Sequence, residues 1–492
     1  MGSTLIAISV TLFLPLIISA FYRLYKHPLR KIPGPRLAAV TNLYAFYYNY
    51  IQEGGYSKQF KGLHEKYNSP VVRIGPNHVH VDKLSFYDEV FRPGTKYRKD
   101  PSFYNSFGGL DGMIDEDGFR TYRSHISSLY SAKSVDMLAP KLLREVQTVA
   151  DRLQKDVGTN QVVNIQKMFR TLSADMVLHI LFPQDIDLFE CDQYHPFLES
   201  FDIMLTKTWL SLSYPFALGL LALLPWPEYK RVGVAAENFA KYCQGWMTKA
   251  QHLQNSGAEK GRDCHIKRYL ELDPTNEKKK KAIPYPLEDI FNFIAGGTDT
   301  TAYIISCVVY YLLKSPNVLS NLQKELDEAA LCIRHKFDHK QIQSLPYLTA
   351  VIKEALRIST PAPGCLPRIV PDGGAHVDSV YIPSGTAVSV SMLSIQQNAD
   401  LFPEPRKFKP ERWLCEEGKA LAKWNIAFSR GPRQCIGTNV AYLELYGTIA
   451  YLFSRFEFAL SGNDGDELEW IDRFTAHNIE DIKVKITKDK WT

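Results

Sequence analysis

Phe428-Ser429-Arg430-Gly431-Pro432-Arg433-Gln434-Cys435-Ile436-Gly437 is a loop that carries one cysteine up to an apolar, helix-like segment, Ile436 to Phe453. A thiolate at Cys435 would face the first free backbone N–H groups of that helix, which favour the charged sulfur. Gly431 allows a sharp turn, and Gly437 leaves space for a flat group against the backbone. Arg433 could pair with an anionic group on the same ligand. These features suit a haem iron with an axial cysteine, whereas a small buried structural cysteine is the alternative interpretation.

The same residues match every fixed position of the pattern F-x-x-G-x-R-x-C-x-G, and the match continues through Gly437-x-x-x-Ala441-x-x-Glu444. The stretch therefore resembles the signature of the haem-thiolate monooxygenases, the cytochrome P450 superfamily. The resemblance implies a mainly α-helical fold with a small β-rich lobe and one haem b. It also implies Cys435 as the iron ligand, Arg433 on a haem propionate, and Phe428 and Gly437 at the cofactor.

The composition is that of an ordinary globular protein. The chain has 492 residues, of which 45% are hydrophobic, 12% aromatic and 23% charged, and its net charge is +5. This weak charge gives no argument for nucleic-acid binding. The eight cysteines show no C-x-x-C spacing, so neither a disulfide framework nor a zinc module is indicated.

The N-terminus reads as a membrane anchor. Residues 5–24 are almost continuously apolar, and a helix needs roughly 20 such residues to cross a bilayer. Basic residues follow this run and none precede it, which favours an uncleaved signal anchor with the rest of the chain in the cytosol. We therefore expect an anchor over 1–25, a basic and proline-rich hinge over 26–36, and the haem-binding domain over 37–492. The hinge resembles that of family members in the endoplasmic reticulum membrane.

An apolar segment, Leu287 to Leu313, is predicted to form a long helix with Gly296 and Gly297 in its middle. Glycines next to hydroxyl residues are a recognised cause of helix kinks, and a kink would open a groove. The segment resembles the family motif [AG]-G-x-[DE]-T-[TS]. By that resemblance Thr300 donates a proton to activated oxygen and Asp299 relays protons from solvent, because O–O cleavage needs protons delivered at one place. A capping cluster at a helix break is the alternative interpretation.

Several further residues take their roles from the resemblance. Arg123 and Arg368 occupy positions that meet the haem propionates. The usual Trp or His before the first of these arginines is Phe119 here, which cannot donate a hydrogen bond and is expected only to pack. Glu354 and Arg357 match the E-x-x-R motif, and with Arg412 they are expected to form a structural network under the haem.

The substrate pocket is predicted from the loop 100–116 and from segments near the distal side. Its candidate wall residues are Phe103, Tyr104, Phe107, Met113, Ala295, Ala362, Pro363, Gly364, Leu366 and Phe474. An apolar run over 214–227 is too short to span a bilayer. It would either dip into the membrane interface beside the substrate entrance or pack in the core.

Together these features predict a membrane-anchored monooxygenase that hydroxylates or epoxidises a hydrophobic secondary metabolite with O2. Electrons would come from NADPH through a reductase flavoprotein that docks on the thiolate side. Short similarities to fungal trichodiene-oxygenase-type members suggest a terpenoid or polyketide-derived substrate. An oxidative rearrangement, ring expansion or dehydration on the same haem is the alternative within enzymes, and a non-catalytic haem carrier is the alternative outside them.

Overall fold

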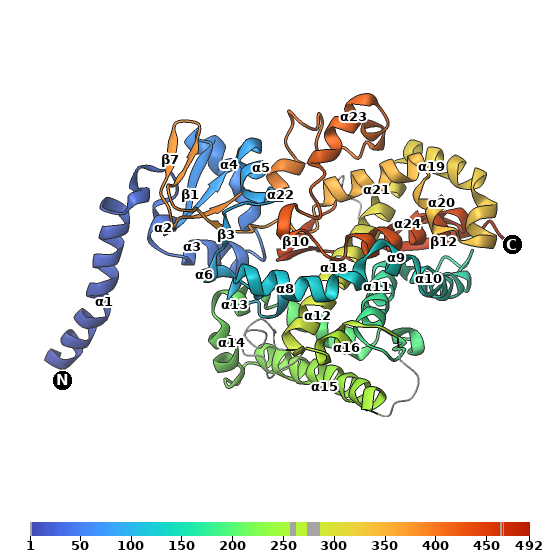
Figure 1. The fold of residues 1–492 in the computed structure, drawn as a ribbon, viewed down its shortest axis with the longest axis horizontal. Helices are drawn as coiled ribbons and strands as arrows, with labels where there is room; N and C mark the ends of the chain where they lie inside the picture. The colour runs from blue at the N-terminus through green and yellow to red at the C-terminus, as the bar shows by residue number, and fades with distance from the viewer. Residues whose placement is uncertain (1, 256–261, 273–285, 463–464, 466) are drawn as a thin grey trace.

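The computed structural model describes residues 2–255, 262–272, 286–462, 465 and 467–492, and Figure 1 shows their arrangement. Helices form most of the molecule and short strands form small sheets, as predicted. The longer helices are α1 (Gly2–Tyr25), α4 (Tyr56–Tyr67), α5 (Leu84–Phe91), α8 (Glu116–Ile126), α10 (Ala139–Gln154), α11 (Ile165–Leu181), α12 (Pro196–Leu205), α14 (Pro215–Ala222), α15 (Pro227–Asn255), α18 (Pro286–Lys314), α19 (Pro316–Glu328), α21 (Pro346–Ser359) and α24 (Thr438–Arg455). The shorter ones are α2 (Arg36–Val40), α3 (Leu43–Phe46), α6 (Pro101–Tyr104), α7 (Gly109–Gly112), α9 (Ala132–Asp136), α13 (Thr208–Ser213), α16 (His265–Leu270), α20 (His339–Gln343), α22 (Met392–Gln396) and α23 (Glu416–Leu421).

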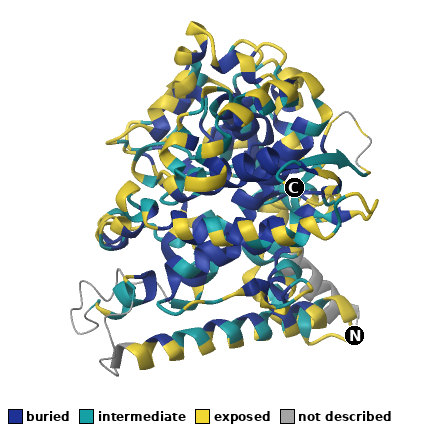
Figure 2. Cartoon of the chain, turned by 90° about the vertical axis from the view of Figure 1, so that its right-hand side faces the viewer, coloured by how far each residue is buried: buried dark blue, intermediate teal, exposed yellow. Residues whose placement is uncertain are grey.

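Helix α18 is the centre of the fold. It begins at Pro286 with two acidic residues in its first turn, which suits the positive end of the helix dipole. Every side chain from Thr301 to Tyr310 is buried, because α11, α21 and α24 surround this half of the helix. Figure 2 shows these buried helices as the dark blue middle of the molecule. The helix is continuous through Gly296 and Gly297, where the sequence predicted a kink.

The largest sheet has five strands in the order β1-β2-β8-β5-β3, and β2 and β8 are its parallel pair. The strands of this sheet are β1 (Val71–Gly75), β2 (His78–Val81), β3 (Arg98–Lys99), β5 (Arg368–Ile369) and β8 (Ala387–Ser389). The others are β4 (Val163–Asn164), β9 (Phe456–Leu460) and β12 (Lys483–Asp489) in one sheet, and the hairpins β6 (Ala375–Val377) with β7 (Val380–Ile382) and β10 (Trp470–Arg473) with β11 (Thr475–Asn478).

The segment after α1 is packed onto the body of the protein. The backbone N–H of Arg73 in β1 donates to the carbonyl of Pro33 at 2.7 Å, and Leu29 is fully buried. A Cβ at Gly34 would lie 2.2 Å from the carbonyl oxygen of Arg73, so this close approach requires glycine. The proline-rich segment therefore holds the end of α1 against the sheet.

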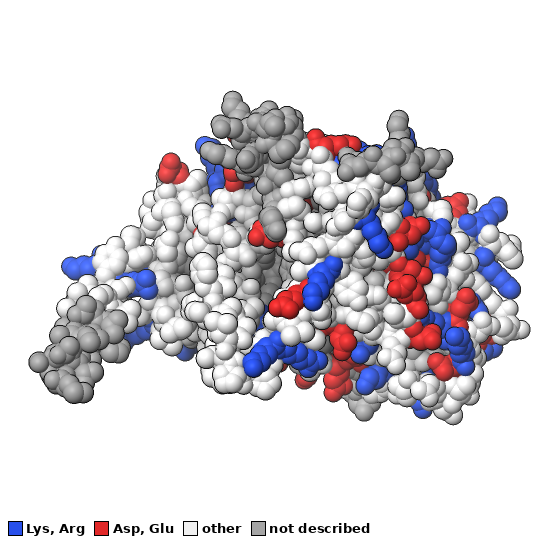
Figure 3. All heavy atoms as spheres, turned by 90° about the horizontal axis from the view of Figure 1, so that it is seen from below, with Lys and Arg blue, Asp and Glu red and all other residues white. Residues whose placement is uncertain are grey.

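Two surface regions are unusually apolar. In α1 the residues with described side chains, Leu14–Tyr25, are mostly exposed, and among the described residues no single helix is both long and apolar enough to cross a membrane. Helix α14 and the turn after it expose Phe216 (86%) and Leu223 (81%). Seen from below, the half of the molecule next to α1 carries few charged side chains, whereas the other half carries many (Figure 3).

Candidate active site

A cavity of about 300 Å³ lies between α18 and the loop that precedes α24. Gly296, Gly297 and Thr300 of α18 line it, and so do Cys435 and Gly437 of the loop. A Cβ at Gly296 would meet nothing within 4 Å, and one at Gly437 would meet only the Cys435 sulfur, at 3.9 Å. Both glycines therefore border open space at this cavity.

The conformation of the loop places Cys435 at this cavity. The Cys435 N–H donates to the carbonyl of Phe428 at 3.0 Å, which closes the loop. Gly431 has φ +74°, and a Cβ there would lie 2.3 Å from the carbonyl oxygen of Phe91. Helix α24 begins only at Thr438, so Cys435 precedes its first turn and lines the cavity, which is inside the protein.

Burial raises the pKa of the Cys435 thiol above its ordinary value, whereas the backbone N–H of Gly437 acts in the opposite direction. The helix start therefore favours the thiolate as predicted, but the effect of burial is larger. A metal ion bound to the sulfur would reverse this balance, because a coordinating thiol loses its proton.

Among the described residues that line the cavity, four are cationic: Lys99, Arg123, Arg368 and Arg433. Arg433 donates to the carbonyl of Met113 at 2.8 Å and to Glu116 at 3.0 Å, and its guanidinium stacks on the ring of Phe119 at 3.5 Å. Its Nε is buried and has no hydrogen-bond partner among the described residues.

The other three cations differ in how they are held. Arg368 donates to the Tyr104 hydroxyl at 2.9 Å. The side chain of Arg123 makes no hydrogen bond or ion pair with any residue that the structure describes. Lys99 was not predicted. It lies opposite Arg368 in the β3–β5 register, and burial lowers its pKa to about 7. A strand of two residues leaves no periodic signal in the sequence, which is why Lys99 was missed.

On the α18 side, Thr300 lines the cavity and donates to the carbonyl of Gly296 at 2.6 Å. Asp299 is buried and is not part of the lining; its carboxylate faces Arg170 of α11 at 2.8 Å. Burial raises the pKa of Asp299 to about 6, and the charge of Arg170 limits the rise. Arg170 was also missed by the sequence analysis, because it lies in a different helix far from Asp299 in the chain.

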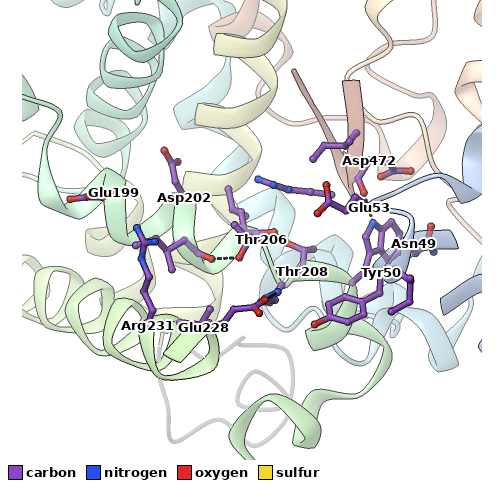
Figure 4. A pocket seen from close by; sticks show the side chains of 18 of the residues that line it. Asn49, Tyr50, Glu53, Glu199, Asp202, Thr206, Thr208, Glu228, Arg231 and Asp472 are labelled. Carbon is purple, nitrogen blue, oxygen red and sulfur yellow. Dashed lines mark hydrogen bonds and ion pairs between the residues drawn. The ribbon is translucent and has the colours of Figure 1, made fainter. Parts of the chain in front are cut away.

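Arg170 connects Asp299 to a second cavity, which is polar and has a volume of about 1020 Å³. Figure 4 shows its wall, with Asp202 on α12 and Asp472 on β10 among the side chains that line it. The Arg170 guanidinium contacts Asp202, and the Tyr194 hydroxyl donates to the same carboxylate at 2.9 Å. The carboxyl of Asp299 thus lies at the end of a polar chain that starts in this second cavity.

The residues predicted for the substrate pocket fall into three groups. Tyr104, Ala362, Leu366 and Phe474 line the cavity. Phe103 and Phe107 lie behind them, with Phe107 packed on the ring of Phe474 at 4.7 Å. Four others are not in the lining: Met113, Ala295, Pro363 and Gly364.

Two of these four have evident reasons to lie elsewhere. Ala295 packs in the apolar cluster formed by α11, α12, α15 and α18, on the side of α18 away from the cavity. A Cβ at Gly364 would face the carboxylate of Asp472 at 3.1 Å rather than the cavity.

The E-x-x-R residues form a buried network under the loop that carries Cys435. Arg357 donates to both oxygens of Glu354 at 2.9 and 2.8 Å, and both side chains have no exposed surface. Two further groups donate to the same carboxylate: the guanidinium of Arg412 at 3.1 Å and the indole N–H of Trp413 at 2.9 Å. Arg357 also donates to the carbonyls of Gln396 and Pro405, so the network fixes a long irregular segment before the loop.

The geometry agrees with comparisons to known proteins. The family model for cytochrome P450 matches residues 33–478. The cytochrome P450 monooxygenase cloA of Claviceps purpurea is 50% identical over 489 residues, covering 99% of this chain and 96% of that protein. The cytochrome P450 monooxygenase phqM of Penicillium fellutanum is 43% identical over 476 residues, covering 94% and 88%. The chain therefore belongs to the cytochrome P450 family of monooxygenases.

Two further comparisons concern the fold and the activity of relatives. The crystal structure of the cytochrome P450DA heme domain has a TM-score of 0.74 and covers 93% of this chain and 98% of that one, at 15% identity, which supports the fold. A Claviceps fusiformis relative, 47% identical over 97% of this chain and 94% of its own length, is described as an inactive cytochrome P450 monooxygenase cloA.

Proposed function

We propose that the chain is a membrane-anchored haem-thiolate monooxygenase that hydroxylates or epoxidises a hydrophobic secondary metabolite with O2 and electrons from NADPH. The observation that carries the proposal is that the Cys435 sulfur and the Thr300 hydroxyl belong to one cavity with a cationic border. A small-molecule substrate would share this cavity with the cofactor.

The residues present fit a haem. The open space beside Gly296 and Gly437 suits a flat ring between α18 and the loop. A haem carries two propionates, and the cationic side chains can neutralise both. Arg123, whose side chain makes no hydrogen bond or ion pair with a described residue, and Arg433, whose buried Nε has no hydrogen-bond partner among them, are the first candidates. When bound to a cysteine thiolate, haem b supplies O–O bond cleavage and transfer of oxygen to carbon.

The protein's own residues would manage the protons. Thr300 can hold a proton at Oγ1 inside the cavity, and Asp299 can renew it, because a carboxyl with a pKa of about 6 exchanges protons near neutral pH. Arg170 holds that carboxyl between the two cavities. Water in the polar cavity beside Asp202 and Tyr194 would supply the protons. The cavity lined by Cys435 and Thr300, which we call the distal cavity, has apolar walls that would keep other water away from the reaction.

Electrons would come from a membrane-bound NADPH reductase flavoprotein on the thiolate side. Pro432 and Gln434, which flank Arg433 in the Cys435 loop, are exposed. An electron donor docked there would be separated from the sulfur by one loop. This supports a docking site on that face.

The anchor proposal rests on two apolar features that lie near one another. Tyr214, just before α14, packs on Phe46 of α3 at 5.1 Å, so α14 adjoins the segment that follows the anchor and hinge. Exposed Phe216, Leu223 and Trp226 would enter the lipid interface beside the N-terminal helix. We propose single-pass anchoring in the endoplasmic reticulum membrane with the catalytic domain in the cytosol.

Flotation of microsomes tests the anchor. Deletion of residues 1–25 should release most of the protein, and a chain that also carries Phe216→Ser and Leu223→Ser should lose the remaining association. The matched control is Leu331→Ser, which changes an exposed leucine in the connection between α19 and α20; Figure 1 shows these two helices on the side of the molecule opposite α14. If the deleted chain floats with lipid as fully as the intact one, the anchor is not in residues 1–25.

The reaction is tested with ¹⁸O₂. The substrate to use is the compound that accumulates when the gene is deleted in the producing organism. With NADPH and reductase, the monooxygenase proposal predicts a product that gains one ¹⁸O atom. An unlabelled product that still requires NADPH would indicate oxidative rearrangement or dehydration, and no NADPH-dependent consumption would indicate a haem carrier.

A further inference from the structure

Asn292 is a polar residue in the wall of the distal cavity that the mechanism does not use. It lies on α18, one turn before Gly296, and is part of the cavity lining. Its side-chain Nδ2 donates to the backbone carbonyl of Gly108 at 3.0 Å and, more weakly, to that of Phe107 at 3.4 Å. Asn292 therefore touches both the cavity and the loop that covers it.

These contacts determine which end of the amide faces the cavity. A carbonyl can only accept, so the NH2 group must point at the loop, and Oδ1 must point away from it. No group among the described residues donates to this Oδ1, and it is not sealed from solvent-sized space. Oδ1 of Asn292 is thus an acceptor at the cavity wall that no described residue uses.

The loop is shaped to hold the amide in this orientation. Gly108 and Gly109 have φ +62° and +49°, and a Cβ at Gly109 would lie 2.5 Å from the Asn292 nitrogen. One turn earlier on α18, Asp289 accepts from the N–H of Leu110 at 2.8 Å. Two anchors on α18 therefore fix the loop, and the fixed loop keeps the Asn292 amide from rotating.

The surroundings of this acceptor favour ligands that carry a hydrogen-bond donor. The lining of the cavity includes several apolar side chains, among them Leu110, Phe293, Leu366 and Phe474. The Thr300 hydroxyl already donates to Gly296, and the cations lie at the end of the cavity expected to hold the propionates. An apolar ligand that covered Oδ1 would remove its hydration without replacement, which is costly for a polar atom. A ligand with a hydrogen-bond donor at this point avoids that cost.

We propose that Asn292 Oδ1 accepts a hydrogen bond from the substrate, and that the substrate is an otherwise apolar small molecule bearing an N–H or O–H group. This inference rests on the proposed function, because it assigns the substrate of the same site. Asn292 then acts as a specificity-determining residue, orienting the ligand through one polar contact in an apolar cavity.

The test compares ligands that differ only in the donor. The probes are carbazole against N-methylcarbazole and 2-naphthol against 2-methoxynaphthalene, titrated by calorimetry into the full-length, haem-reconstituted protein. One hydrogen bond predicts that each donor-bearing probe binds roughly three- to tenfold more tightly than its methylated partner. In Asn292→Leu, which has similar volume and no acceptor, the ratio should fall to about one.

Because Asn292→Leu also releases the Gly108 carbonyl, Asp289→Ala serves as the control, since it removes the acceptor of the second loop anchor. It should weaken both members of a pair equally and keep their ratio. A wild-type protein that does not prefer the donor-bearing member of either pair, or a preference that survives in Asn292→Leu, contradicts the inference. A missing haem-thiolate spectrum contradicts the proposed function instead, because the calorimetric ratio does not depend on it.

Discussion

The two sides of the cavity are built differently. Under the Cys435 loop, Arg357, Arg412 and Trp413 all donate hydrogen bonds to the buried carboxylate of Glu354 and exclude solvent from it. On the other side, short segments from distant parts of the chain pack against α18: the loop 100–116, which contains α6 and α7, and the hairpin β10–β11. Short local motifs specify the side that would hold the cofactor, whereas the side that would hold the substrate is assembled from distant segments.

The largest effect should come from Arg357→Lys. A lysine cannot make the paired contact with Glu354, and breaking a fully buried ion pair costs about 3–5 kcal/mol. We expect little folded, haem-binding protein, measured as yield and as the midpoint of chemical unfolding. Lys419→Ala is the matched control, because it removes an exposed pair of the same i,i+3 spacing with Glu416. An unfolding midpoint like that of wild type would show that the network is dispensable.

Asp472, in the distal hairpin, should make stability depend on pH. Burial raises its pKa from 3.8 to about 7, so the folded state holds the proton longer than the unfolded state. The free energy of unfolding should therefore fall as pH rises from about 4 to about 7, by at most ~4 kcal/mol, and then level off.

Asp472→Asn should remove most of that slope, because an amide can still accept from the Phe474 N–H and donate to Ser57. Unfolding curves between pH 4 and pH 8 measure the effect, with Glu480→Gln at the exposed end of the same region as the control. An unchanged slope in Asp472→Asn would mean that other groups cause the pH dependence.

Thr300→Val and Asp299→Asn should each lower product formation by about 100-fold, because proton transfer by a positioned group contributes roughly that much. Haem content should stay near that of wild type in both variants, and more of the NADPH should end as hydrogen peroxide. Thr301→Val, which removes a neighbouring hydroxyl in the cavity lining, should change product formation only slightly. Equal losses in Thr300→Val and Thr301→Val would remove the special role of Thr300.

Lys99→Met should weaken retention of the cofactor by about tenfold, the value expected for one charged hydrogen bond. The rate of haem transfer to apomyoglobin measures this. Lys96→Met, which removes an exposed charge three residues earlier, is the control. If both variants lose haem at the wild-type rate, Lys99 does not contact a propionate.

Much of the architecture could be predicted from the sequence. Alternation around a Gly-Pro turn predicts a β-hairpin over 71–81, and an uninterrupted apolar run predicts the long helix at 287–313; the structure contains both as β1–β2 and α18. The apolar spacing of residues 147–181 predicts a helix, but in the structure β4 separates α10 from α11 within this segment. That division depends on the pairing of β4 with β12 at the other end of the chain.

The site was less predictable because several of its contacts have no local signal. Arg170 meets Asp299 only because α11 packs along α18, and Asn292 becomes important only when Gly108 and Gly109 press the loop against it. The predicted wall residue Ala295 packs against the apolar cluster of α11, α12, α15 and α18 and does not line the cavity. The sequence did not predict this, because a helical run alone does not indicate which face a neighbouring loop will cover. Motif matches therefore identify the residues expected to take part in the reaction, whereas tertiary packing determines which residues line the substrate side of the cavity.

The central claim is that the Cys435 sulfur binds iron as an anion. The most direct measurement is the absorption spectrum of the reduced, carbon-monoxide-bound protein, recorded for wild type and Cys435→His. The account predicts the strongly red-shifted Soret band of thiolate-ligated haem in wild type and its loss in Cys435→His. A wild-type Soret band at the position seen in histidine-ligated globins, unchanged by the substitution, would contradict it.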